Sequence, residues 1–187
     1  MSAVPPPQRA ADDVPPPVRQ PATDADLAAV AEQLGRPPRG TRAVAHRCPC
    51  GLPDTVETSP RLADGTPFPT LFYLTCPRAT AACSRLESAG VMKEMAERLA
   101  ADPELAARYR AAHEDYLARR EAIAPVPEIA GISAGGMPGR VKCLHVHLAH
   151  ALAAGPGVNP FGDEVLELVE PWWTGGPCVQ PTTGQTQ

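Results

Sequence analysis

Proline is the residue that most restricts how this chain can fold, because 24 of its 187 residues are proline. Proline lacks a backbone N–H and fixes φ, so it ends helices and interrupts sheet ladders. Seven of these prolines lie before residue 22, among small and polar residues. Such a segment buries too little apolar surface to offset the entropy lost on ordering it. We therefore expect residues 1–22 to be a disordered tail with polyproline II character.

The rest of the chain has the composition of one folded domain. Apolar residues make up 43% of the sequence, which is enough for a core. Aromatic residues make up only 4%, so alanine, leucine and valine must fill most of that core. A single domain commonly has roughly 100–200 residues. We expect the domain to span residues 23–170 and residues 171–187 to form a flexible tail.

Charge and hydropathy exclude two classes of partner. The net charge is −4, and lysine and arginine form no basic block. Non-specific binding of nucleic acid needs clustered positive charge, so we expect no nucleic-acid partner. No apolar run approaches the roughly 18–20 residues that a membrane span needs, and the N-terminus lacks the apolar segment of a signal peptide. We expect a cytoplasmic protein that does not contact a membrane.

The secondary-structure signals predict an α+β fold. Thr23 is suited to cap a first helix and Gly35 to end it, while Asp64-Gly65 is a hairpin signal between two strands. Helices are expected over 24–34, 79–89, 91–101, 103–123, 140–153 and 163–169. Strands are expected over 41–47, 55–58 and 70–75. These segments predict a small antiparallel sheet of about three strands, packed with four to six helices.

Cysteine and histidine are concentrated in three short segments, 46–51, 75–77 and 142–150. These segments hold four of the six cysteines and four of the five histidines. In a reducing compartment, clustered cysteines indicate metal binding or catalysis before disulfides. Thiolate and imidazole are ligands that zinc selects. The sequence therefore predicts a zinc site where the three segments meet.

The residues alone leave the set of ligands open. Cys48 and Cys50 have one residue between them, whereas a zinc-knuckle turn has two. On an ideal helix Cys143, His147 and His150 share one face. In that geometry a histidine at 145 points elsewhere, unless the residues before it still belong to the preceding loop.

Two further interpretations of these segments remain. One is a thiol active site, with Cys143 or Cys76 as the nucleophile and a nearby histidine as the base. A helix that begins at residue 143 would lower the pKa of that thiol. The other interpretation is metal-free, with the cysteines acting as small buried residues and the histidines as hydrogen-bonding groups.

A glycine-rich loop at residues 133–139 is a candidate anion site. Such loops present free N–H groups where they enter a helix, and Arg140 and Lys142 follow directly. This arrangement suits a phosphate or a carboxylate, so a small anionic ligand contacted by these two residues is predicted. A plain flexible glycine loop is the alternative.

Several longer motifs resemble the bacterial DUF501 family, whose members have no assigned function. The motifs are CPCGLP, SPRLADGTPFPTLFYLTCP, SRLE, AGGMPGRVKCLH and GPGVNPFGD, and the resemblance covers about residues 24–170. It implies a cytoplasmic bacterial protein and no particular activity. It also favours Cys48, Cys143, His145 and His150 as metal ligands, with Cys76 as an alternate.

Three hypotheses follow for the function. The first is a cytosolic protein with a Cys/His zinc site, in which three protein ligands plus water would suit hydrolysis and four ligands would serve structure alone. The second is a metal-free interaction or scaffold protein. The third is a hydrolase-like protein that acts on a phosphate-bearing ligand through Arg140 and Lys142.

Overall fold

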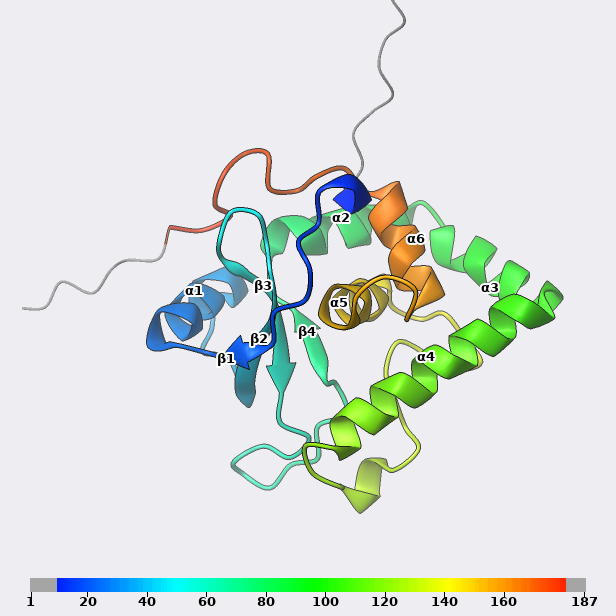
Figure 1. Cartoon of the computed structure of the whole chain (residues 1–187), viewed down its shortest axis with the longest axis horizontal. Helices are drawn as coiled ribbons and strands as arrows, with labels where there is room; N and C mark the ends of the chain where they lie inside the picture. Colours follow the sequence, from blue (N-terminus) through cyan, green and yellow to red (C-terminus); the bar gives the residue numbers. More distant parts are fainter. Residues whose placement is uncertain (1–9, 181–187) are drawn as a thin grey trace, which may run out of the picture.

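A four-stranded antiparallel sheet and six α-helices make up the part of the chain, residues 10–180, that the computed structural model describes (Figure 1). The strands follow the order β1-β2-β3-β4 in the sheet. They are β1 (Gln20–Pro21), β2 (Thr41–Arg47), β3 (Pro53–Thr58) and β4 (Phe72–Leu74). The helices are α1 (Asp24–Leu34), α2 (Pro77–Ser88), α3 (Val91–Ala101), α4 (Pro103–Glu121), α5 (Leu144–Ala154) and α6 (Pro160–Leu168). The predicted α+β class is confirmed, with four strands instead of about three.

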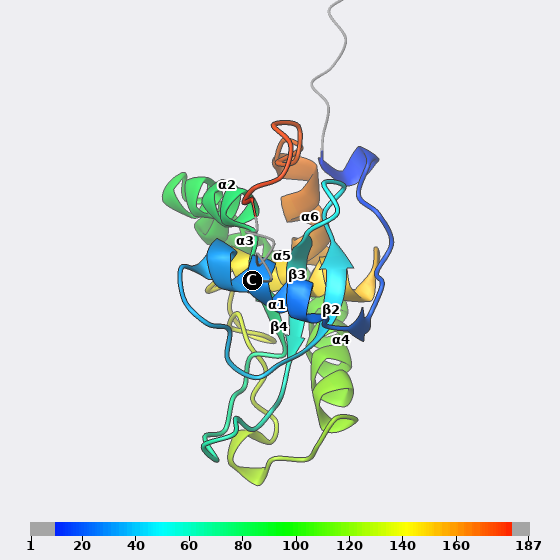
Figure 2. The same ribbon diagram turned by 90° about the vertical axis from the view of Figure 1, so that its left-hand side faces the viewer.

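Helix α5 is the centre of the fold. It packs against β4 on one side and against α6 and α2 on others, while α1 lies across the opposite face of the sheet (Figures 1 and 2). A helix that is buried nearly all round carries few charges, and α5 has none among Asp, Glu, Lys and Arg. Its buried residues are Leu144, His147, Leu148, Ala149, His150, Ala151, Leu152 and Ala153. Two of the clustered histidines therefore lie in the core.

The first helix has the ends that the sequence predicts. The Thr23 hydroxyl accepts a hydrogen bond from Asp26 N, and the Asp26 carboxylate accepts one from Thr23 N. This reciprocal capping satisfies two N–H groups that the helix leaves free. Gly35 ends α1 at φ 66°, a left-handed conformation that glycine adopts without a steric penalty.

The structure places residues 10–22 against the domain, where the sequence predicted a disordered tail. Ala10 is fully buried, and its N–H donates to the carbonyl of Val169. Further along, His46 Nε2 lies 2.8 Å from the carbonyl oxygen of Pro15. Proline has no N–H to donate, but the carbonyl groups of an extended proline-rich segment still accept hydrogen bonds, and the segment can still pair with the edge strand of a sheet. Strand β1 forms in this segment and accounts for the fourth strand, whereas residues 1–9 lie outside the described residues.

The predicted C-terminal tail also contacts the domain over residues 171–180. Trp172 is buried, and Arg78 donates hydrogen bonds to carbonyl oxygens of Gly175, Gly176 and Pro177. Residues 181–187 of the predicted tail lie outside the described residues. None of the helices within residues 10–180 is long and apolar enough to cross a membrane.

Helix α5 begins at Leu144, four residues later than predicted. The N–H of Lys142 donates to Gly135 and that of Arg140 to Gly136, so the glycine loop holds these residues in its own turn. Cys143 consequently becomes the N-cap of α5, with φ −156° and ψ 108°. This position removes Cys143 from the helical face on which it was expected to join His147.

Candidate metal centre

Glu87, Cys143 and His145 form the one group of three close metal-ligating side chains found within residues 10–180. One ligand atom from each residue lies within 4.8 Å of the other two. Glu87 comes from the last turn of α2, Cys143 caps α5, and His145 belongs to the first turn of α5. The packing of α2 against α5 therefore brings the three side chains together.

The two nitrogens of the His145 ring have different surroundings. Nε2 lies 3.2 Å from the carbonyl oxygen of Thr80 and 3.3 Å from the hydroxyl of Ser84. A carbonyl only accepts, so Nε2 carries a hydrogen and donates it. Nδ1 lies 3.6 Å from Cys143 Sγ and 3.1 Å from Glu87 Oε1. Nδ1 therefore faces a sulfur and a carboxylate oxygen at once.

The electrostatics of the cluster favour a thiolate next to a protonated imidazole. Burial acts to raise the pKa of Cys143, but the hydrogen bond with His145 and the backbone N–H of Val146 outweigh it and leave the pKa lowered. The pKa of His145 is raised, first by the hydrogen bond with Cys143 and also by the charge of Glu87. A thiol with a lowered pKa is a better nucleophile at neutral pH and a better metal ligand.

The distances from His145 Nδ1 to the other two ligand atoms suit one zinc ion. Tetrahedral zinc, with Zn–S bonds of about 2.3 Å and Zn–N and Zn–O bonds of about 2.0–2.1 Å, holds sulfur and nitrogen about 3.6 Å apart and nitrogen and oxygen about 3.3 Å apart. The corresponding separations here are 3.6 Å and 3.1 Å. A metal-binding histidine also commonly donates its other N–H to a carbonyl, as His145 does to Thr80.

A cavity of about 270 Å³ lies beside this cluster. Its lining is mostly apolar and comes from β4, the start of α2 and the first turn of α5. The residues are Thr70, Phe72, Tyr73, Leu74, Thr80, Cys143, His145 and Val146. Cys143 and His145 thus line a space large enough for a small molecule.

The other predicted ligands lie elsewhere, each with its own partner. His150 is fully buried, its Nε2 lies 2.9 Å from Asp115 Oδ2, and its Nδ1 contacts the Asn159 amide. Cys48 interacts with the thiol of its neighbour Cys50 and Cys76 with that of Cys178, and all four are free cysteines. Among the sequence-predicted ligands, the structure brings together only Cys143 and His145.

His147 and His150 belong to a buried hydrogen-bond network. His147 Nε2 lies 3.0 Å from the Tyr109 hydroxyl, and its Nδ1 lies 3.2 Å from the Asn159 amide. Burial lowers the pKa of His147 to about 3, so this ring is neutral. Both nitrogens of each histidine are thus already committed, and the two residues stabilise the core.

Glu87 is the site residue that sequence reasoning missed. The predicted ligands were thiols and imidazoles, although carboxylates also bind zinc. A signal was available, because Glu87 is the last residue of the motif SRLE, one of the motifs that carry the family resemblance. Nothing in the sequence says that α2 runs beside the start of α5, so the carboxylate could not be assigned to the site.

The predicted anion contacts are exposed. Arg140 and Lys142 both point to solvent, and the N–H groups of Met137, Arg140 and Lys142 donate to carbonyls of the same loop. These N–H groups are therefore not directed at an anion. An anionic ligand at this loop stays a prediction.

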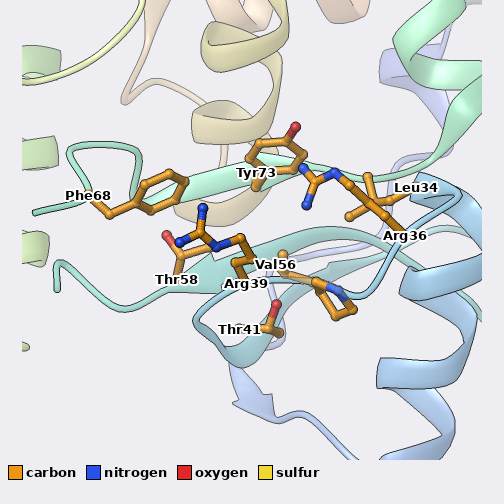
Figure 3. A pocket seen from close by; sticks show the side chains of 9 residues that line it. Leu34, Arg36, Arg39, Thr41, Val56, Thr58, Phe68 and Tyr73 are labelled. Atoms are coloured by element: carbon orange, nitrogen blue, oxygen red, sulfur yellow. The ribbon is translucent and has the colours of Figure 1, made fainter. Parts of the chain in front are cut away.

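A second cavity, of about 430 Å³, lies on the face of the sheet that carries α1 (Figure 3). Arg36 and Arg39 come from the segment after α1, and Figure 3 shows their guanidinium groups reaching over the cavity towards the rings of Tyr73 and Phe68. Arg39 also pairs with the exposed Asp64 at 2.7 Å. The remaining lining residues are Leu34, Pro38, Thr41, Val56 and Thr58.

The fold and the cluster thus define an α+β protein with a candidate metal centre at the junction of two helices. The chain belongs to the DUF501 family, described as "Protein of unknown function", whose family model matches residues 44–167. All three residues of the cluster lie within the matched segment. Comparison with curated proteins and with solved structures gave no match.

Proposed function

We propose that this chain is a cytoplasmic bacterial protein that binds a zinc ion through Glu87, Cys143 and His145. One observation carries the proposal. With Nε2 committed to the Thr80 carbonyl, His145 Nδ1 faces the Cys143 sulfur and the Glu87 carboxylate. Three electron-rich atoms at this separation repel one another unless a cation, either a proton or a metal ion, lies among them.

The number of ligands favours a catalytic site over a structural one. Structural zinc sites are closed by four protein ligands, whereas catalytic sites keep one position open for water or substrate. Here three ligands lie beside a cavity of about 270 Å³. Bound zinc supplies Lewis acidity and lowers the pKa of a coordinated water to about 7, which is the chemistry of a hydrolase.

Elemental analysis of protein purified without a histidine tag tests the proposal. We expect close to one equivalent of zinc, and a large loss of metal in Glu87→Gln, Cys143→Ser and His145→Gln. Cys50→Ser is the matched control, because its thiol is half-buried and lies outside the cluster. Less than about a tenth of an equivalent of any transition metal, with no effect of a chelator on melting, would exclude the metal.

A second candidate function follows if a proton, and not a metal ion, lies among the three ligand atoms of Glu87, Cys143 and His145. Without metal, the lowered pKa of Cys143 and the raised pKa of His145 describe a thiolate–imidazolium pair, the resting state of a thiol nucleophile. Both candidates predict that a thiol reagent modifies Cys143. Only the zinc site predicts that added zinc protects Cys143 and that a chelator restores the reaction.

The cavity beside α1 is the better supported place for a small anionic ligand. Two guanidinium groups suit a carboxylate or phosphate, and the rings of Phe68 and Tyr73 suit a planar group. Calorimetric titration with AMP, adenosine and inorganic phosphate tests this. We expect AMP to bind more tightly than the other two, and Arg36→Gln/Arg39→Gln to abolish the difference, whereas the exposed control Arg110→Gln keeps it. If the double variant bound AMP as tightly as the wild type does, the assignment would be refuted.

A further inference from the structure

The segment after α6 is held so that Cys178 meets the start of α2. Arg78 Nη1 donates to the carbonyl of Gly176 at 2.7 Å, and its Nη2 donates to Gly175 and Pro177. On the other side, Gln33 Nε2 donates to Pro53 O at 2.7 Å and to Cys178 Sγ at 3.3 Å. Side chains of α1 and α2 thus fix this segment from two directions.

The second thiol is Cys76, the N-cap of α2. It is 1% exposed, whereas Cys178 is only half-buried. The two thiols interact, and this interaction raises the pKa of Cys76 and lowers the pKa of Cys178. The hydrogen bond with Cys178 and burial raise the pKa of Cys76, against the effect of the N–H groups of Arg78 and Ala79 in the first turn of α2, so Cys76 keeps its proton. The pair therefore combines a partly accessible thiol with a buried one.

We infer that Cys76 and Cys178 form a redox-active dithiol, which a hydroperoxide oxidises to an intramolecular disulfide and a small-molecule dithiol reduces again. The inference does not depend on the proposed zinc site, because it uses different cysteines. Cys76 lies within the segment matched by the family model, residues 44–167, and Cys178 lies beyond it. The pairing is therefore a property of this chain's C-terminal segment and does not come from the family match.

The oxidation proceeds in two balanced steps. The Cys178 thiolate attacks the peroxide oxygen, the O–O bond breaks, and Cys178 becomes a sulfenic acid while hydroxide leaves and takes up a proton to form water. The Cys76 thiol then attacks the sulfenic sulfur and forms the S–S bond, and the displaced hydroxide takes up the thiol proton to form a second water. Two thiols and one hydrogen peroxide thus give one disulfide and two waters.

The surroundings of the two sulfurs agree with this order of attack. The pKa of Cys178 is lowered to about 6, first by the hydrogen bond with Cys76 and then by the donor Gln33, against the effect of burial. The half-buried Cys178 can meet a peroxide, whereas the buried Cys76 can meet only Cys178. Arg78 keeps Cys178 in place between the two steps.

The test is peptide mapping of the full-length protein after reduction, removal of reductant and treatment with one equivalent of hydrogen peroxide. Cleavage after Lys, Arg and Glu, except at the Glu170–Pro171 bond, which proline protects, releases peptides 62–78 and 168–187, which contain Cys76 and Cys178 as their only cysteines. We expect these two peptides to be joined, at a rate independent of protein concentration, and dithiothreitol to separate them. The reaction should raise the melting temperature, because a disulfide restricts the unfolded chain.

Variants separate this assignment from a non-specific reaction. Cys178→Ser should lose both the joined peptide and the rise in melting temperature, while Cys50→Ser keeps both. Arg78→Gln should slow the joining severalfold without preventing folding, because it releases only the C-terminal segment. If peptide 168–187 is joined to another cysteine, if only intermolecular dimers form, or if Cys178 accumulates as sulfinic acid, the inference is wrong.

Discussion

Glu87→Gln is the substitution that tests the candidate metal centre most sharply, because Glu87 has two separable roles. Its Oε1 accepts a hydrogen bond from the Leu144 N–H at 2.8 Å, and Leu144 is the first residue of α5. The carboxylate thus satisfies a free N–H of α5 and adds negative charge at the positive end of the helix. The same oxygen faces His145 Nδ1.

The magnitude of the first role follows from the loss of charge. Glutamine keeps an acceptor, so the change replaces a charge-assisted hydrogen bond of about 1.5–3 kcal/mol by a neutral one of about 0.5–1.5 kcal/mol. We expect the metal-free variant to lose about 1 kcal/mol of stability. In a domain of this size, that lowers the melting temperature by roughly 2–4 °C.

The second role appears only with metal. Zinc at 100 times its dissociation constant stabilises the native state by about 2.7 kcal/mol, or roughly 5–11 °C. A tenfold loss of affinity removes about 1.4 kcal/mol of that gain. Thermal melts of wild type and Glu87→Gln, with chelator and with zinc, therefore measure the two roles separately.

Glu94→Gln is the control, since Glu94 is an exposed residue of the neighbouring helix α3. If Glu87→Gln melts like wild type in chelator, the capping role is refuted. If it gains as much from zinc as wild type does, Glu87 is not a ligand.

Three further predictions concern the site and the core. In metal-free protein, iodoacetamide should modify Cys143 rapidly at pH values below the ordinary thiol pKa. The reason is that the thiolate–imidazolium pair is lost only as pH falls through the lowered pKa of Cys143 or rises through the raised pKa of His145. An unchanged dependence of the rate on pH in His145→Gln would contradict this. Gly162→Ala should destabilise the protein by about 1–3 kcal/mol in urea denaturation. The added Cβ would collide with the carbonyl oxygen of His147 and lie 2.7 Å from a side-chain atom of Ala151. A variant as stable as the wild type would show that α5 and α6 can separate. Asp115 should contribute stability that is lost as pH falls from about 4 to about 2, because hydrogen bonds from His150 and Arg119 outweigh burial and lower its pKa to about 2. Asp115→Asn should remove that part of the acid unfolding transition. An acid transition identical to that of the wild type would exclude the role.

Local sequence signals were sufficient for most of the fold. The capping residue Thr23 and the terminal Gly35 define α1 to the residue, and Asp102-Pro103 marks the start of α4. Such signals work because a helix end is decided by a few neighbouring residues. The start of α5 could not be found in this way, since it depends on hydrogen bonds between the glycine loop and Lys142.

The candidate site was predictable only in part, for a related reason. Cys143 and His145 are neighbours in sequence, so their association required no knowledge of packing. Glu87 joins them through the packing of α2 on α5, which is a long-range property of the fold. His150 was selected by residue type, but its ring is buried between Asp115 and Asn159, which the sequence does not indicate.

Cys76 and Cys143 occupy the same kind of position in the fold, but the side chains beside them differ and give the two thiols different chemistry. Cys76 and Cys143 are both N-caps, of α2 and α5, and backbone N–H groups of the first turn face each sulfur. The pKa of Cys143 is lowered, whereas the hydrogen bond with Cys178 and burial raise the pKa of Cys76. At Cys143 the neighbours are an imidazole and a carboxylate, which together with the thiolate form the candidate group of metal ligands. At Cys76 the neighbour is a second thiol, which makes disulfide formation the available reaction. Removing the partner thiol should therefore remove the reaction: Cys178→His should abolish the peroxide-dependent disulfide and leave metal binding by Glu87, Cys143 and His145, measured in the same preparation, as it is in the wild type.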